Sequence, residues 1–209
     1  MSEGIIIIGA GGFGRESVDV VQAMGRSVQG VLDDNPSDLN LERLAAQGTP
    51  YLGTMDAWLA TSPPSTHYLV GIGKGSIRER LSRRMDGAGH RAAIAVHPTA
   101  TLGSNSTLGE GTIICAGARI TTNVNIGCHV HLNPNVSIGH DSTLQDFVSV
   151  NPAGNISGEC MISTRTLIGV NAAVLQQLTV GQDVVVGAAA LVTKDVPDSA
   201  VVKGVPGKW

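Results

Sequence analysis

A histidine and an aspartate stand side by side at His140-Asp141, within the stretch SIGHDSTL. An imidazole can accept a proton near neutral pH, and a neighbouring carboxylate can select its tautomer and stabilise the imidazolium. We therefore interpret His140 as a candidate general base and Asp141 as the group that orients it. An exposed surface histidine without a catalytic role remains the alternative.

A glycine cluster, GAGGFG at residues 9–14, follows an apolar stretch and precedes a helical pattern that runs to about residue 24. Such a strand–turn–helix unit brings backbone N–H groups and a helix N-terminus close to a phosphate. We also expect Arg78 to add positive charge there. Glycines that serve only strand–helix packing are the alternative. The predicted substrate contacts are Gly9, Gly11, Gly12, Phe13, Gly14, Asp33, Asp34 and Lys74.

The elements around this cluster alternate between strand and helix. Apolar stretches predict strands at residues 4–8, 27–32, 67–72 and 91–96, with a short helix at 56–60 and a basic helix after GIGKGS. This order predicts a small parallel sheet with flanking helices in a domain of residues 1–95. A dinucleotide requires a second mononucleotide-binding half, so a single nucleotide or a nucleotide-sugar fits this length better than NAD.

The rest of the chain repeats every six residues. From Val96 to Val192 every sixth residue is Leu, Ile or Val, in seventeen consecutive hits. A six-residue unit that ends in turn formers predicts one face of a β-solenoid, with 18 residues in each three-faced coil. Seventeen units make about 5.7 coils, or roughly 27 Å at a strand spacing of ~4.8 Å. We expect this domain to span residues 96–209.

The repeat places His140 and Asp141 at turn positions, so their side chains should project from a corner of the solenoid. One coil later stands Gly158, which has no side chain. This predicts open space above the imidazole.

Composition and charge exclude several classes of protein. A net charge of -3 gives no reason to expect a nucleic-acid partner, and three cysteines without CxxC spacing do not predict a disulfide framework. The N-terminal region has neither a basic segment nor a long apolar one, so we expect a cytoplasmic protein without membrane insertion. His129 and His131, together with His140, leave a zinc site as an alternative, but Gln145 stands where a further ligand is needed. No metal is expected.

The chain resembles the hexapeptide-repeat sugar O-/N-acyltransferases, a family that includes sialic acid O-acetyltransferases and N-acetyltransferases of nucleotide-linked 4-amino sugars. The resemblance rests on the segments IIIIGAGGFGRESVDVV, LDD, VHPTA, GHD and KGVPGK. It implies an α/β fold class, with a small Rossmann-like βαβαβ domain followed by a left-handed parallel β-helix. It also implies a homotrimer, with acetyl-CoA in the groove between subunits and His140 as the general base.

The resemblance further implies which residues contact the cofactor. Asn133 and Gly158 match positions that contact the pantetheine arm of CoA in relatives. On charge alone, the candidates for binding the CoA phosphates are Lys194, Lys203 and Lys208. Two departures from the family are visible: Ser149 and Phe13 stand where many relatives have histidines. The expected cofactor contacts are Asn133, Ser149, Gly158, Val170, Ala188, Lys194 and Lys203.

Three functions remain open from the sequence. The favoured one is acetyl-CoA-dependent N-acetylation of a nucleotide-linked amino sugar of the 4-amino-4,6-dideoxy type, because the glycine loop and Asp33-Asp34 suit a nucleotide. O-acetylation of sialic acid would need no nucleotide. A noncatalytic scaffold would bind no CoA.

Overall fold

The computed structural model describes residues 4–63 and 65–209, and its first unit is a four-stranded parallel sheet. The strands are β1 (Ile5–Ile8), β2 (Val28–Leu32), β3 (His67–Val70) and β4 (Arg91–Ala92), in the order β2-β1-β3-β4. All four isoleucines of β1 are buried, as expected for a central strand that is covered on both faces. Three of the strands match the prediction closely.

Helices cover both faces of this sheet. On one face, α1 contributes to a core that also contains Ile5 and Ile7, and on the other face α3 and α4 pack against Ile6 and Ile8. The sequence analysis did not predict α2, which begins at a cap from the Ser37 side chain. The helices are α1 (Gly12–Ala23), α2 (Asp38–Ala46), α3 (Met55–Leu59) and α4 (Gly75–Gly87).

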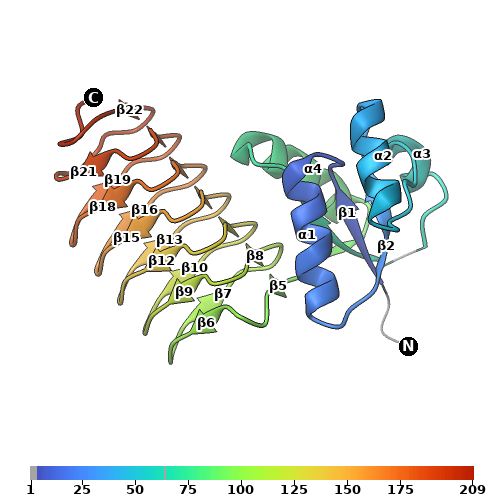
Figure 1. Cartoon of the computed structure of the whole chain (residues 1–209), viewed down its shortest axis with the longest axis horizontal. Helices are drawn as coiled ribbons and strands as arrows, with labels where there is room; N and C mark the ends of the chain where they lie inside the picture. The colour runs from blue at the N-terminus through green and yellow to red at the C-terminus, as the bar shows by residue number, and fades with distance from the viewer. Residues whose placement is uncertain (1–3, 64) are drawn as a thin grey trace.

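The second unit is a parallel β-solenoid of two-residue strands, which rises coil by coil to the C-terminus (Figure 1). Face 1 contains β5 (Ala95–Val96), β8 (Ile113–Ile114), β11 (His131–Leu132), β14 (Ser149–Val150), β17 (Leu167–Ile168), β20 (Val185–Val186) and β22 (Val201–Val202). Face 2 contains β6 (Thr101–Leu102), β9 (Arg119–Ile120), β12 (Ser137–Ile138), β15 (Asn155–Ile156), β18 (Ala173–Val174) and β21 (Leu191–Val192). Face 3 contains β7 (Thr107–Leu108), β10 (Asn125–Ile126), β13 (Thr143–Leu144), β16 (Met161–Ile162) and β19 (Thr179–Val180).

Each strand pairs with the strand one coil away, so that Asn125 lies beside Thr143 and Ser137 beside Asn155. This confirms the predicted 18-residue coil. The aliphatic residue of each six-residue unit points inward, and these side chains form one continuous core along most of the solenoid. The chain turns at three corners, which we name 1–2, 2–3 and 3–1 after the faces that they join.

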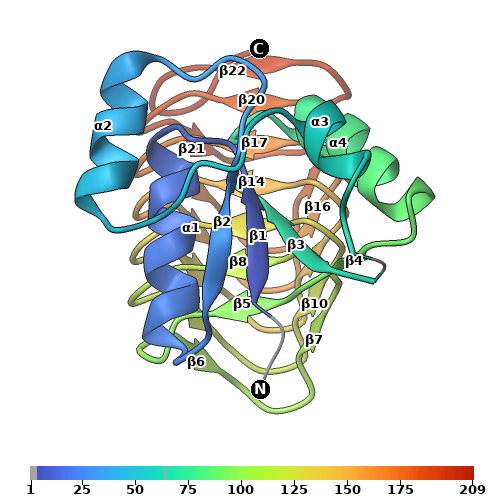
Figure 2. The ribbon, with the colours of Figure 1, turned by 90° about the vertical axis from the view of Figure 1, so that its right-hand side faces the viewer.

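The small sheet and its helices pack on face 1 (Figure 2), from β5 and β8 up to the coil that contains Arg165. Helix α1 contacts β5 and β8, and Ile113 of the solenoid belongs to the same core as Val18 of α1. The strand predicted over residues 91–96 is two strands, because β4 ends in the small sheet and β5 opens face 1. In the described part of the chain, no helix has the length and apolar character needed to cross a membrane.

Candidate active site

His140 and Asp141 lie at the 2–3 corner, between β12 and β13. The imidazole Nδ1 and the Asp141 Oδ2 are 2.7 Å apart, and the two side chains are 57% and 47% exposed. Asp141 has φ 61°, which turns the chain sharply and leaves both side chains outside the core. The predicted corner position is therefore confirmed.

The Asp141 carboxylate is engaged on both oxygens. Oδ1 accepts a hydrogen bond from Asn123 Nδ2 at 3.0 Å, while Oδ2 faces His140. The bond from Asn123, and then the one from His140, lower the pKa of Asp141 below its ordinary value. An ionised carboxylate only accepts hydrogen bonds, so Nδ1 donates to it, and in a neutral imidazole this leaves the lone pair on Nε2. Among the described residues, none forms a hydrogen bond with this Nε2.

Gly158 lies one coil above His140, as predicted, but the space expected above the imidazole is not open, because the ring itself fills the space beside Gly158. A Cβ at this position would lie 2.6 Å from both Cε1 and Nε2 of His140. The imidazole thus occupies the volume that a side chain would need. Glycine at position 158 therefore leaves room for the ring beside the coil.

A cavity of about 370 Å³ opens at the carboxyl edge of the small sheet. Three loops meet there, because the strands are parallel and each ends at this edge: the glycine loop after β1, the loop after β2 and the loop after β3. The cavity is lined by Gly9, Asp33, Asp34, Asn35, Arg80 and several apolar side chains. Such an edge is where open parallel sheets bind ligands.

The two aspartates have different roles in this cavity. Both oxygens of Asp33 accept backbone N–H groups, from Ala10 at 2.8 Å and from Asn35 at 2.9 Å, so Asp33 holds the glycine loop in place. Asp34 accepts the Met55 N–H with Oδ1 only. The second oxygen of Asp34 is the carboxylate atom with capacity left for a ligand.

The glycines of the loop also divide into two pairs. A Cβ on Gly14 would lie 1.7 Å from the Gly9 carbonyl oxygen, and Gly9 itself has φ +112°, so the fold requires both. Gly11 and Gly12 have nothing within 4 Å of such an atom. Packing therefore explains glycine at positions 9 and 14, whereas Gly11 and Gly12 border open space at the start of α1. No side chain caps α1, whereas Ser37 and Thr54 cap α2 and α3.

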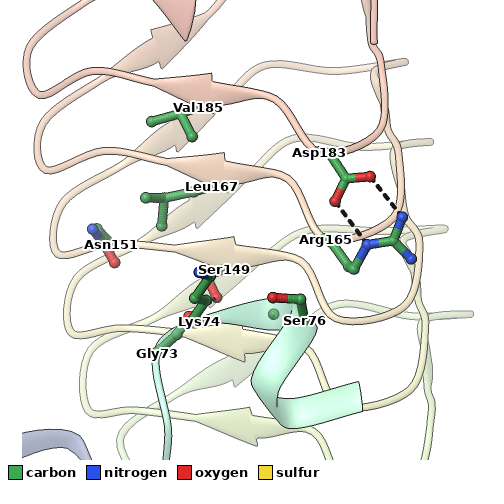
Figure 3. A pocket seen from close by; sticks show the side chains of 10 residues that line it. Gly73, Lys74, Ser76, Ser149, Asn151, Arg165, Leu167, Asp183 and Val185 are labelled. Atoms are coloured by element: carbon green, nitrogen blue, oxygen red, sulfur yellow. Dashed lines mark hydrogen bonds and ion pairs between the residues drawn. The ribbon is translucent and has the colours of Figure 1, made fainter. Parts of the chain in front are cut away.

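A second cavity, of about 430 Å³, lies on face 1 above the N-terminus of α4 (Figure 3). Ser149, Asn151, Leu167 and Val185 come from the solenoid, and Lys74 comes from the loop before α4. One side is closed by an ion-pair network in which Arg165 binds both carboxylate oxygens of Asp183 and also Glu79. Asn151 and the Arg165–Asp183 pair were not predicted, although Asn151 lies 18 positions after Asn133 and Asp183 lies 18 positions after Arg165. The bond of Arg165 to Glu79, 86 positions away, has no such spacing.

Two predicted contacts lie elsewhere. The ring of Phe13 packs against the His131 imidazole, with centroids 4.4 Å apart, and not toward the cavity at the sheet edge. Arg78 has no exposed surface, so it is not positioned to neutralise a phosphate. The expectation for Arg78 was wrong, because its helix turns the side chain toward the solenoid.

Arg78 instead joins the two units. It donates to the carbonyl oxygens of Gly73 and Ile72 in the loop before α4, and to those of His129 and Phe147 in the solenoid. It also donates to Ser149 Oγ at 3.0 Å, and that hydroxyl donates to the Gly73 carbonyl. Burial lowers the pKa of Arg78 to about 9, and no carboxylate appears among its partners in the described residues.

Ser149 is only 3% exposed and lies on face 1, whereas His140 lies on the opposite edge of the solenoid. His129 and His131 are buried at the junction between the two units, so the imidazoles of His129, His131 and His140 do not converge within one chain.

The remaining expected cofactor contacts also lie far apart within one chain. Asn133, Val170 and Ala188 lie at the 1–2 corner, Gly158 lies at the 2–3 corner, and Lys194 stacks on Trp209 near the C-terminus beside Lys203 and Lys208.

Comparison with known proteins places this geometry in a family. Residues 4–85 match the family described as the PglD N-terminal domain. The GDP-perosamine N-acetyltransferase of Escherichia coli O157:H7 is 28% identical over 187 residues, which are 87% of this chain and 82% of that protein.

Solved structures agree over the whole length. PerB from Caulobacter crescentus, in complex with CoA and GDP-perosamine, is 31% identical with a TM-score of 0.90, and the match covers 100% of this chain and 97% of that one. The acetyltransferase domain of PglB from Neisseria gonorrhoeae, in complex with acetyl coenzyme A, is 26% identical with a TM-score of 0.86, over 100% and 99% of the two chains. The fold is thus a Rossmann-like domain followed by a left-handed β-helix. The chain belongs to the hexapeptide-repeat family of nucleotide-linked amino-sugar acetyltransferases.

Proposed function

We propose that this protein transfers the acetyl group of acetyl-CoA to the amino group of a nucleotide-linked 4-amino-4,6-dideoxy sugar, with a GDP-linked sugar as the first candidate. The observation that carries the proposal is the exposed His140-Asp141 pair at the 2–3 corner, in which Nδ1 lies 2.7 Å from the Asp141 carboxylate and Nε2 has no hydrogen-bond partner among the described residues. The relatives named above act on or bind GDP-perosamine and CoA, which supports the same substrate class. We also place the reaction in the cytoplasm.

The proposed chemistry uses His140 as the general base. The sugar amine attacks the thioester carbonyl carbon and passes its proton to Nε2. The carbon–sulfur bond then breaks, and the proton moves from the imidazolium to the departing CoA thiolate. Asp141 stabilises the imidazolium between these steps, because its carboxylate is 2.7 Å from Nδ1.

The N-terminal domain, residues 1–95, is proposed to hold the nucleotide in the cavity at the sheet edge. The N–H groups at the uncapped start of α1 suit a diphosphate, because Gly11 and Gly12 border open space there, and the spare oxygen of Asp34 suits an N–H or O–H of the base or ribose. Lys74, which is exposed between the two cavities, would add positive charge along the path to face 1.

The solenoid, residues 96–209, is proposed to carry acetyl transfer, but one copy cannot complete the site. Both cavities lie on face 1 or on the domain attached to it, while His140 is on the opposite edge. The 2–3 corner of one subunit must therefore approach face 1 of another. A head-to-tail contact closes into a ring when its rotation brings the last subunit back to the first, and we propose that three subunits do so, as a homotrimer with each active site between two subunits.

In this arrangement, CoA would lie between subunits and contact residues from both. Gly158 comes from the subunit that supplies His140, whereas Ser149 comes from the subunit that supplies face 1. The separation of the expected cofactor contacts within one chain is what such a shared site requires. Ser149 already donates its hydrogen bond to Gly73, so its proposed contact with CoA would have to replace or share that bond.

The decisive experiment measures thiol release from acetyl-CoA with GDP-, UDP- and dTDP-linked 4-amino sugars and with free sialic acid. Turnover with a nucleotide-linked amino sugar, and its loss in His140→Asn, is the expected result. Turnover with sialic acid alone would replace the proposal by O-acetylation. Failure to bind CoA would leave a noncatalytic scaffold.

Subunit sharing has its own test. A His140→Asn chain keeps an intact face 1, and a Leu167→Arg chain keeps an intact His140 but blocks the cavity on face 1. Mixed assemblies should recover activity that neither variant has alone. A fully active monomer in light scattering would contradict the shared site.

A further inference from the structure

The 2–3 corner carries a column of residues in the left-handed backbone conformation, each one coil from the next. These residues have φ values between 57° and 62°, so their side chains leave the solenoid in the same direction and lie above one another. All five side chains are polar. The column consists of Asn105, Asn123, Asp141, Glu159 and Gln177.

Hydrogen bonds along the column have a direction. Asn105 Nδ2 donates to Asn123 Oδ1 at 3.2 Å, and Asn123 Nδ2 donates to Asp141 Oδ1 at 3.0 Å. From the other end, Gln177 donates to Glu159 at 3.0 Å. An amide can both accept and donate, whereas a carboxylate only accepts, so the lower chain ends at Asp141.

The hydrogen bonds along this column matter because the proposed catalytic pair, His140 and Asp141, is exposed. His140 and Asp141 are about half exposed, and core packing does not hold a side chain that projects into solvent. Asp141 is held by one hydrogen bond to each oxygen, from Asn123 and from His140. Without Asn123, the carboxylate could rotate about its side-chain bonds and lose its alignment with Nδ1.

We propose that Asn123 is a positioning residue for the general base: its amide fixes the Asp141 carboxylate, which in turn holds His140 in the Nδ1–H tautomer. This inference rests on the proposed function and identifies a residue that does not contact substrate. Asn123 lies 17 positions before His140 in the chain and one coil below Asp141. The lower pKa of Asp141 agrees with the same bond.

The kinetic test compares three variants. Asn123→Ala should lower kcat about tenfold, with little change in either KM, because a hydrogen bond to a charged group is lost outside the substrate contacts. Asn123→Asp should lower kcat further, because a second carboxylate then faces Asp141. Asn171→Ala is the matched control, since Asn171 has the same backbone conformation with φ 54° at the 1–2 corner. It should retain kcat within about twofold.

The spectroscopic test does not depend on turnover. In ¹⁵N-histidine-labelled protein, the resonances of His140, assigned by their loss in His140→Asn, should show protonated Nδ1 and bare Nε2. Asn123→Ala should shift them toward a mixture of tautomers, and Asn171→Ala should not. A structural role for Asn123 would lower stability without this change.

Normal kcat and unchanged His140 resonances in Asn123→Ala would overturn the inference while leaving acetyl transfer intact. If the native protein releases no thiol from acetyl-CoA with any nucleotide-linked amino sugar, the proposed function fails first. The two failures are therefore distinguishable.

Discussion

His140 and Ser149 are nine residues apart, yet they belong to regions with opposite character. The corner at His140 is exposed, and its contacts come from neighbouring residues or from one coil away, as with Asn123 and Gly158. The junction at Ser149 is buried, and its contacts come from Arg78 and Gly73, 71 and 76 positions away. The corner is built by the repeat alone, whereas the junction depends on a second domain.

This contrast predicts which property an amino-acid substitution should change in each region. A substitution at the corner should alter chemistry and leave the fold nearly unchanged. A substitution at the junction should lower stability, because it leaves buried polar groups without partners. Five predictions test this separation, from the largest expected effect to the smallest.

Replacing His140 should have the largest effect. His140→Asn should lower kcat about 10³-fold, within the range of ~10²–10⁴ typical of general-base catalysis. CoA binding by calorimetry and the melting temperature should stay close to those of the native protein, since the side chain is exposed. Retention of more than about a tenth of the native turnover would remove His140 as the base.

Arg78 tests the junction between the two units. Arg78→Met should lower the free energy of unfolding by about 3 kcal/mol, because the carbonyls of His129 and Phe147 then remain buried without this donor. Arg83→Met is the control, because Arg83 is 76% exposed and pairs only with Glu79 at the surface; it should change stability by less than about 1 kcal/mol. Denaturant titration measures both, and equal stabilities would contradict the role of Arg78 in joining the domains.

Gly158 tests how closely the corner constrains the imidazole. Gly158→Ala should lower kcat by about 10²-fold, because its Cβ would displace the His140 ring, and a shift of ~1 Å in a reacting group has an effect of this size. Gly87→Ala is a suitable control, since nothing lies within 4 Å of its Cβ position. Normal kcat in Gly158→Ala would mean that the ring is active in another orientation.

The junction should also be sensitive to acid. Burial lowers the pKa of His129 from 6.5 to about 4 and lowers that of His131 as well. Protonation therefore favours the unfolded chain, so the stability contributed by neutral His129 is present above pH 6.5 and is lost as the pH falls toward 4. From pH 7 to 5, His129 should reduce the free energy of unfolding by about 2 kcal/mol.

Denaturant titrations at the two pH values check this, with His129→Asn as the comparison. Asparagine tolerates the left-handed conformation of residue 129, at φ 53°, and does not titrate. The variant should lose most of the His129 contribution to the pH dependence. An unchanged pH dependence would show that other groups cause it.

The smallest expected effect concerns the glycine loop. Gly11→Val should raise the KM for the nucleotide-sugar about tenfold, because the new side chain enters open space that we assign to the phosphates, and a polar contact is typically worth ~1.5 kcal/mol. The KM for acetyl-CoA and the melting temperature should change little. A parallel rise in both KM values would indicate instead that the loop supports the fold.

The corner was largely predictable from sequence, because its geometry is local and periodic. Once the six-residue repeat is recognised, every residue has its spatial neighbour 18 positions away, which placed His140 at a turn and Gly158 above it. Asn123 was overlooked, although the same spacing from Asp141 identifies it. The sequence also predicted the parallel sheet and its glycine loop, since strand, turn and helix are consecutive in the chain.

The junction could not be predicted in this way. The inward turn of Arg78, the contact of Phe13 with His131, and the burial of Ser149 all depend on how the small sheet packs against face 1. No period links positions 51 to 76 residues apart, as the bonds of Arg78 to His129 and of Ser149 to Gly73 require. Sequence alone thus determined the solenoid, its corner and the position of the His140-Asp141 pair through short, repeated spacings. Only the tertiary structure decided which polar side chains became buried between the domains, because burial depends on the surface that each one meets.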